Sequence, residues 1–292
     1  MARADCPHCE GSGWKVVERT TRGAQALASA ETARPGPAAG EPKMVWAVPC
    51  DCTAEDREER ALQRARVPER YRHCDFENYE VDNDIENVPR EQQVSWNRSL
   101  AQAKLVVQGF AAEFPVGSEH GLLLMGPCGV GKTHLAVSAL REIILRGHSG
   151  LFYDYREMLK EIQDSYNSES QATEMSVLEP VLKTEILVLD DVGSSKPSLW
   201  ALETVGHVLN SRYNEKRVTL LTTNFLDSDG LAANSAIAPA RSAGLRAPLL
   251  EDSLTDRVGR RIRSRLYEMC RTIEISAPDY RKEIRHAGHF RA

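Results

Sequence analysis

Short apolar runs alternate with amphipathic stretches over most of this chain. The runs cover residues 121–125, 150–154, 185–191, 217–224 and 271–275. Runs of this length and composition are typical of buried parallel strands. The stretches between them repeat apolar residues at the three- and four-residue spacing of a helix with one buried face. Strands that alternate with helices predict an α/β fold, in which helices cover both faces of a parallel sheet.

The expected helices differ in how clearly they are marked. The clearest begins near Val94, and its apolar residues recur at alternating steps of four and three: Trp96, Leu100, Ala103, Val107, Phe110 and Phe114. Further helices are expected at residues 134–144, 155–166, 199–213 and 252–269, and a short last one after Pro278. We expect a long loop at residues 226–250.

Four cysteines lie in two close pairs near the N-terminus. They are Cys6 and Cys9, separated by two residues, and Cys50 and Cys52, separated by one. Two such pairs suit a tetrahedral Zn²⁺ site with a polypeptide loop between them, although free thiols remain the alternative. Residues 22–42 are rich in Ala, Gly and Pro and are expected to form that loop. We therefore expect a zinc-binding module and linker over residues 1–65 and a second domain over residues 66–292.

The first apolar run leads into a motif with a defined chemistry. The motif reads Gly126-Pro127-Cys128-Gly129-Val130-Gly131-Lys132-Thr133, is followed by His134, and fits the phosphate-binding loop of nucleotide hydrolases. Its glycines allow backbone N–H groups to surround phosphate oxygens at the positive end of the next helix. Lys132 would neutralise the β- and γ-phosphates of ATP, and Thr133 would offer its hydroxyl to Mg²⁺.

Polar residues end two other expected strands. Asp190 and Asp191 end the third strand, and Asn224 ends the fourth. Ligands of parallel sheets bind beyond the carboxyl ends of the strands, where the phosphate loop also lies. We expect Asp190 to join Thr133 in holding Mg²⁺, Asp191 to orient or deprotonate the attacking water, and Asn224 to position that water.

The helix expected at residues 252–269 combines an apolar stripe with a row of arginines. The stripe is Leu254, Val258, Ile262 and Leu266, and the row is Arg257, Arg261 and Arg265. Like charges four residues apart disfavour a helix by a few tenths of a kcal/mol per pair, so the row is expected to meet an anion. A neighbouring subunit's γ-phosphate and a nucleic-acid backbone both fit, and a solvated basic face is the alternative.

Composition narrows the class of protein. Of the 292 residues, 41% are hydrophobic and 27% charged, which is typical of a soluble globular protein. We expect a cytoplasmic protein without a membrane partner, because no apolar run approaches the length of a membrane span and no signal peptide precedes Cys6. The formal net charge of −5 argues against a constitutive nucleic-acid binder but leaves room for a local basic patch.

Several motifs, taken in order, resemble one family. They are Val-Pro-Glu-Arg-Tyr at 67–71, Phe-Glu-Asn-Tyr at 76–79, the phosphate loop, Val-Leu-Asp-Asp-Val-Gly at 188–193, Thr-Thr-Asn at 222–224 and Ser-Arg-Leu at 264–266. This set resembles the bacterial replicative helicase loaders of the DnaC/DnaI type, which are AAA+ ATPases related to DnaA. The resemblance covers about residues 66–286.

The resemblance implies a fold and a set of roles. The implied sheet has five parallel strands in the order 5-1-4-3-2. Asp190 and Asp191 stand at the Walker B acids, Asn224 at the first sensor and Arg281 at the second sensor. Arg265 stands at the arginine finger, which acts on ATP in the adjacent subunit.

The leading expectation is an ATP-dependent loader that acts in the initiation of DNA replication. Its ligands would be ATP, Mg²⁺ and Zn²⁺, and its partners the replicative DNA helicase, single-stranded DNA and further copies of itself. The closest rival has the same core motifs and is an IstB-type transposition ATPase that acts on DNA with a transposase. Two further hypotheses are a DnaA-like initiator and a zinc-binding scaffold that is gated by nucleotide binding and has no useful hydrolysis.

Overall fold

The structure is a computed structural model that describes residues 6–10, 12–20, 43–82, 85, 88–116, 120–166, 173–227 and 252–283. The chain divides into two compact units, residues 1–61 and 62–292. Most of the loop expected at 226–250 lies outside the described residues. No helix in the described ranges is both long enough and apolar enough to span a bilayer.

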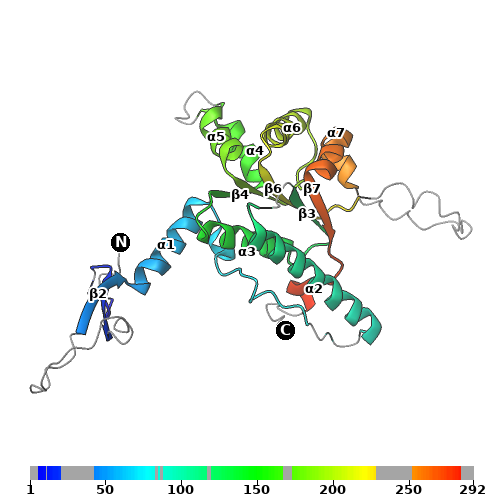
Figure 1. Cartoon of the computed structure of the whole chain (residues 1–292). Helices are drawn as coiled ribbons and strands as arrows, with labels where there is room; N and C mark the ends of the chain where they lie inside the picture. Colours follow the sequence, from blue (N-terminus) through cyan, green and yellow to red (C-terminus); the bar gives the residue numbers. More distant parts are fainter. Residues whose placement is uncertain are drawn as a thin grey trace, which may run out of the picture. The chain divides into compact units, whose positions relative to one another are not determined.

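The first unit contains an antiparallel hairpin. Its strands are β1 (Trp14–Thr20) and β2 (Lys43–Pro49), drawn as blue arrows in Figure 1. They pair so that Trp14 lies opposite Pro49 and Thr20 opposite Lys43. Helix α1 (Asp51–Arg64) follows. Neither strand was expected, because the two partners are separated by more than twenty residues and the sequence between them carries no apolar period.

The second unit is built on a five-stranded parallel sheet. Its strands are β3 (Gly121–Met125), β4 (Gly150–Asp154), β5 (Ile186–Asp190), β6 (Val218–Thr223) and β7 (Cys270–Glu274). They lie side by side in the order β4-β5-β6-β3-β7. Read from the other edge and numbered along the sheet's own strands, this order is 5-1-4-3-2, so the expected sheet is confirmed.

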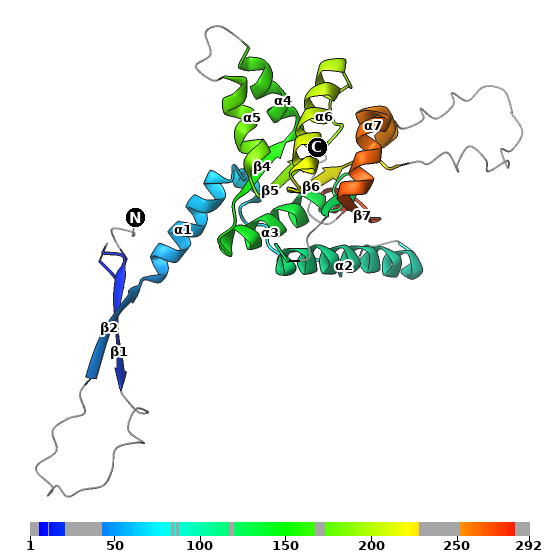
Figure 2. The same ribbon diagram turned by 45° about the horizontal axis from the view of Figure 1, so that its top comes forward.

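Two groups of helices cover the two faces of this sheet (Figure 2). On one face lie α2 (Arg90–Glu113) and α3 (Lys132–Leu145). On the other lie α4 (Tyr155–Asp164), α5 (Glu174–Lys183), α6 (Leu199–Asn214) and α7 (Leu254–Met269). The short elements η1 (Glu69–Tyr71) and α8 (Tyr280–Glu283) contain no buried residues. Alternate residues of each strand enter opposite cores, as the period of two requires.

Three details of the helices differ from the expectation. Helix α2 begins at Arg90, directly after Pro89, rather than near residue 94. Helix α5 was not expected, because Pro180 lies inside it; the side chain of Thr173 caps its first turn. Helix α7 is interrupted at Gly259, whose φ of 79° and ψ of 153° are outside the helical region. The interruption separates Arg257 from the rest of the expected arginine row.

A buried arginine ties the amino-terminal ends of the strands to the helices. Arg212 of α6 is fully buried. Its guanidinium donates to Thr219 Oγ1 at 2.9 Å, to the Val181 carbonyl at 2.8 Å and to the Thr184 carbonyl at 3.0 Å. It also donates to the carbonyl of Val218. Burial lowers the pKa of Arg212 to about 9, which reflects the cost of desolvating the charge that these acceptors offset.

Candidate functional site

The phosphate loop connects β3 to α3. Gly131 is the N-cap of α3 and has a left-handed backbone, with φ 86° and ψ 18°. A side chain there would also collide with Tyr79, because an added Cβ would lie 2.4 Å from its ring. Only glycine suits this position, where the chain turns so that the first backbone N–H groups of α3 face the cavity beyond the sheet.

Lys132 points into that cavity from the first turn of α3. Its side chain is largely buried, and its Nζ donates to the carbonyls of Gly126 at 2.9 Å and Pro127 at 2.7 Å. It also donates to Asn224 Oδ1 at 2.7 Å. Burial lowers the pKa of Lys132, and the nearby carboxylates of Asp190 and Asp191 oppose that shift. The expected lysine and first sensor are therefore in direct contact.

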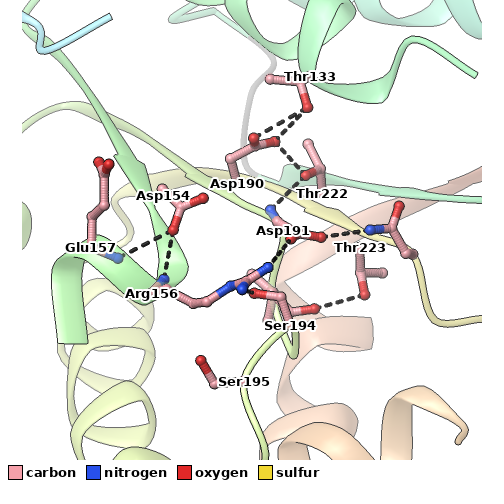
Figure 3. A network of polar contacts seen from close by, with 12 residues as sticks. Thr133, Asp154, Arg156, Glu157, Asp190, Asp191, Ser194, Ser195, Thr222 and Thr223 are labelled. Atoms are coloured by element: carbon pink, nitrogen blue, oxygen red, sulfur yellow. Dashed lines mark hydrogen bonds and ion pairs between the residues drawn. The ribbon is translucent and has the colours of Figure 1, made fainter. Parts of the chain in front are cut away.

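Asp190 lies at the end of β5 between two threonine hydroxyls (Figure 3). Thr133 Oγ1 donates to Asp190 Oδ1 at 2.9 Å, and Thr222 Oγ1 donates to the same oxygen at 2.6 Å. Only 6% of Asp190 is exposed. Burial raises the pKa of its carboxyl, and the two hydroxyl donors act in the opposite direction. A buried acid with so few donors is costly as an anion unless a cation approaches it.

Asp191 has partners in β6, directly after β6, and in α4. Its backbone adopts φ 57°, which is uncommon for a residue other than glycine. Its N–H donates to Thr222 Oγ1 at 2.9 Å, and its Oδ1 accepts from Asn224 Nδ2 at 2.6 Å. Its other oxygen lies 3.6 Å from Nη2 of Arg156, which follows β4 (Figure 3). The two expected acids thus lie side by side and share Thr222, but their side chains face different partners.

Thr133 and Asp190 suit the divalent cation expected here. A hydroxyl and a carboxylate in contact at the positive end of a helix supply the hard oxygen ligands that Mg²⁺ prefers. The cation would relieve the buried negative charge of Asp190.

The cavity beyond these residues has a volume of about 950 Å³. The phosphate loop, both acids and Asn224 form its floor. Two further segments line it: residues within 70–80, called the first wall, and residues within 277–281, called the second wall. The first wall was not expected to reach the site. In the sequence, only the motifs at 67–71 and 76–79 pointed to this wall, because their mixed polar and aromatic composition has the period of neither a helix nor a strand.

His134 and Arg281 both line this cavity, as expected. The Nε2 of His134 lies 2.8 Å from the carbonyl of Asp75, and its ring packs edge-on against Tyr79 with centroids 5.4 Å apart. His134 therefore connects the phosphate loop to the first wall. Arg281 lies in α8, and its N–H donates to Asp279 Oδ1 at 3.0 Å.

Arg265 is not among the residues that line the cavity. Its guanidinium lies over the ring of Tyr213, 5.3 Å from the centroid. Arg257 is occupied within its own chain, by Asp252 at 2.9 Å and by the ring of Phe225 at 4.5 Å. The prediction of one continuous arginine row is therefore wrong, because Arg257 lies before the break at Gly259 and is bound within its own chain. Among the described interactions, Arg265 has none with the phosphate loop.

The first unit gathers three of the four N-terminal cysteines. Cys6, Cys9 and Cys50 are buried, and their sulfurs lie within 4.8 Å of one another. The Sγ atoms of Cys6 and Cys50 are 3.7 Å apart. Thiolates around a tetrahedral Zn²⁺ at ~2.3 Å have sulfurs ~3.8 Å apart, so this spacing fits the metal. The side chain of Cys52 lies outside the described residues.

The chain is similar to proteins of known role. It is 26% identical over 177 residues to the replicative helicase loader DnaC of Escherichia coli strain K12, a match that covers 59% of this chain and 66% of that protein. It is 28% identical over 110 residues to the replicative helicase loader DnaI of Bacillus subtilis strain 168, covering 37% of this chain and 34% of that protein. A crystal structure of the DnaC helicase loader superposes with a TM-score of 0.51 at 28% identity, over 72% of this chain and 100% of that one.

One family signature covers more than half of the chain. The signature described as IstB-like ATP binding protein matches residues 57–229, which include the first wall of the cavity, the phosphate loop, Asp190, Asp191 and Asn224. The sheet order, the loop geometry and the paired acids described above agree with this assignment. The chain belongs to the IstB-like ATP-binding protein family, and its fold is that of the AAA+ ATPases.

Proposed function

We propose that this chain is an ATP-dependent replicative helicase loader. The observation that carries the proposal is the connected network of Lys132, Thr133, Asp190, Asp191 and Asn224 at the floor of one cavity. The role as a helicase loader is supported by the names of the two relatives described above, each of which is a replicative helicase loader. Their matched regions cover at most 66% of their own lengths, so the partners are carried over as proposals.

The residues divide the work on ATP among them. Lys132 exchanges its contacts with carbonyls and Asn224 for the β- and γ-phosphates, which compensates the desolvation that lowers its pKa. Thr133 and Asp190 hold Mg²⁺, which supplies charge neutralisation on the phosphates. Asp191 and Asn224, already bonded to each other at 2.6 Å, orient the attacking water. Arg281 reaches the nucleotide from the second wall.

Arg265 acts between subunits in this proposal. It lies away from the cavity of its own chain, on α7, with its guanidinium stacked on Tyr213. A finger that completes a neighbour's site would make hydrolysis depend on self-assembly, and such residues are worth a factor of ~10³ or more in rate. ATP binding within one chain would not need it.

The N-terminal module of residues 1–65 is proposed to hold Zn²⁺ and to grip the helicase. Cys6, Cys9 and Cys50 supply three thiolates, and Cys52 is the proposed fourth ligand. The ATPase domain of residues 66–292 would place the helicase on single-stranded DNA in response to ATP. The metal would serve the fold of the module rather than the hydrolysis of ATP.

The proposal is tested by reconstitution. The chain, the replicative helicase of the same source and a single-stranded DNA circle are combined with ATP, and helicase retained on the DNA is measured. Lys132→Ala should weaken ATP binding and abolish retention, because the cation that faces the phosphates is gone. Retention of helicase that is equal with and without this chain would refute the loader role.

The family signature itself favours a second candidate, an IstB-type transposition ATPase. Such a protein would act on duplex DNA with a transposase rather than with a helicase. Affinity purification of the chain from its native cells in ATP separates the two: the replicative helicase as main partner supports the loader, and a transposase supports the second candidate.

A further inference from the structure

A tyrosine–glutamate hydrogen bond joins the two walls of the nucleotide cavity to each other. Tyr280 Oη donates to Glu80 Oε2 at 2.8 Å, although the residues are 200 positions apart. Both residues line the cavity. The bond therefore closes a ring made of the phosphate loop and the two walls.

The second wall is fixed directly on the phosphate loop. The N–H of Tyr280 donates to the carbonyl of Gly129 at 3.2 Å. An added Cβ on Gly129 would lie 1.7 Å from Asp279 Oδ1, so this wall touches the loop where the loop has no side chain. Gly129 also has φ 79°, a backbone that glycine adopts at no steric cost. Two further hydrogen bonds fix the residues directly before this wall. The N–H of Ile275 donates to the Met125 carbonyl at 2.8 Å, and the N–H of Ser276 donates to Ser99 Oγ at 3.0 Å.

The first wall is fixed on the next residue of the same loop. Tyr79, next to Glu80, is buried, and its hydroxyl donates to the carbonyl of Val130 at 3.0 Å. Lys104 of α2 donates to the Tyr79 carbonyl at 3.1 Å. Each wall is thus anchored independently of the tyrosine–glutamate bond, and that bond can open without unfolding either wall.

We propose that Glu80 and Tyr280 are positioning residues that form a clasp over the cavity and set the rate at which nucleotide leaves it. The inference rests on the proposed function only in taking the occupant to be ATP or ADP. When the bond is made, the two walls are held together next to the phosphate loop. When it breaks, the mouth between them widens and nucleotide escapes.

The effect should appear in dissociation rather than in association. Loss of one hydrogen bond to a charged acceptor at a partly exposed site changes the stability of the closed state by a factor of roughly five to ten. We therefore expect Tyr280→Phe to release nucleotide about fivefold faster, since the ring stays and only the hydroxyl is lost. The association rate should stay within about twofold, because most affinity changes at a fixed site lie in dissociation.

The experiment uses the full chain loaded with ADP that carries an N-methylanthraniloyl group on its ribose, chased with excess unlabelled ADP in a stopped-flow instrument. Tyr280→Phe and Glu80→Ala should each accelerate release, and the double variant should be no faster than either alone. Glu80→Gln keeps an acceptor and should lie close to the unsubstituted chain. The matched control is Tyr166→Phe, which removes a similar bond to Glu174, at 3.1 Å and remote from the cavity.

Unchanged release from Tyr280→Phe would overturn the clasp, as would additive effects of the two substitutions. Equal acceleration by Tyr166→Phe would also overturn it, because the effect would then be general loosening of the chain. If all variants bind the labelled ADP and release it at one rate, only the clasp fails. If the unsubstituted chain does not bind the labelled ADP, the proposed function fails together with it.

Discussion

Thr222 is the residue through which the two acids of the site are connected. Its hydroxyl donates to Asp190 Oδ1 at 2.6 Å and accepts from the Asp191 N–H at 2.9 Å, and the residue is 1% exposed. Thr222→Val has nearly the same shape and removes both bonds. It is therefore a substitution that changes the polar connection between the acids and little else.

The cost to stability follows from the groups left behind. The Asp191 N–H loses its partner in a partly buried place, which costs ~1–3 kcal/mol. The buried Asp190 carboxyl loses one of its two hydroxyl donors and keeps Thr133, which costs a further ~1 kcal/mol. We expect the free energy of unfolding to fall by about 2–4 kcal/mol, measured by urea denaturation without nucleotide.

The effect on function has a defined sign. Burial raises the pKa of Asp190, and the Thr222 hydroxyl opposes that rise by stabilising the ionised form. Removal of the Thr222 hydroxyl therefore raises the pKa of Asp190 further. Asp190 must be ionised to hold a cation, so the acidic limb of the pH–rate profile for ATP hydrolysis should move to higher pH. Loss of the Asp191 anchor should lower the plateau rate about tenfold, or ~1.4 kcal/mol in activation free energy.

The neighbouring threonine provides the control. Thr223 is fully buried on the same strand, its hydroxyl donates to the Val192 carbonyl at 2.8 Å and accepts from the Phe225 N–H at 3.2 Å, and none of its described bonds reaches either acid. Thr223→Val should lose similar stability and leave the acidic limb in place. If both variants shift that limb equally, or if neither does, the reasoning about Asp190 is refuted.

Three other predictions concern distant parts of the chain. Arg212→Leu should lower the free energy of unfolding by ~3–5 kcal/mol, because several buried carbonyls lose the donor that this guanidinium supplies. Urea denaturation measures the change, and a loss below ~1 kcal/mol would contradict the prediction. Arg265→Ala should bind ATP normally and lose hydrolysis that rises with protein concentration, and a mixture with Asp191→Asn should recover part of it; full turnover by Arg265→Ala alone would show that the site is complete in one chain. Elemental analysis should find about one zinc per chain, and Cys9→Ser should lose it while ATP binding persists; metal-free protein would argue for plain thiols.

Much of the second unit could be predicted from sequence because its signals are local. Each strand is a short apolar run, and the polar residues that end β5 and β6 meet because carboxyl ends of parallel strands share one edge. Thr222 stood out in the sequence only as part of the Thr-Thr-Asn motif. Its role between the acids depends on the register of β6 against β5, which a single sequence does not reveal.

The parts that sequence did not predict depend on distant partners. The hairpin joins segments on either side of a long insertion, so no local period marks it. Residues 70–80 were not expected at the cavity, because their position is set by contacts such as that of Tyr79 with Val130 rather than by a helix or strand pattern. The interruption of α7 at Gly259 could not be predicted from the apolar stripe, because the four-residue spacing of the stripe continues unchanged across it.

The contact between Gly129 and Asp279 constrains how these positions can vary in evolution. Any side chain at 129 would need a left-handed backbone and would have to displace the Asp279 carboxylate that lies 1.7 Å from the place of its first carbon. A relative that replaces this glycine must therefore carry a compensating change in the second wall. In an alignment of close homologues, positions 129 and 279 should covary, even though 150 residues separate them along the chain.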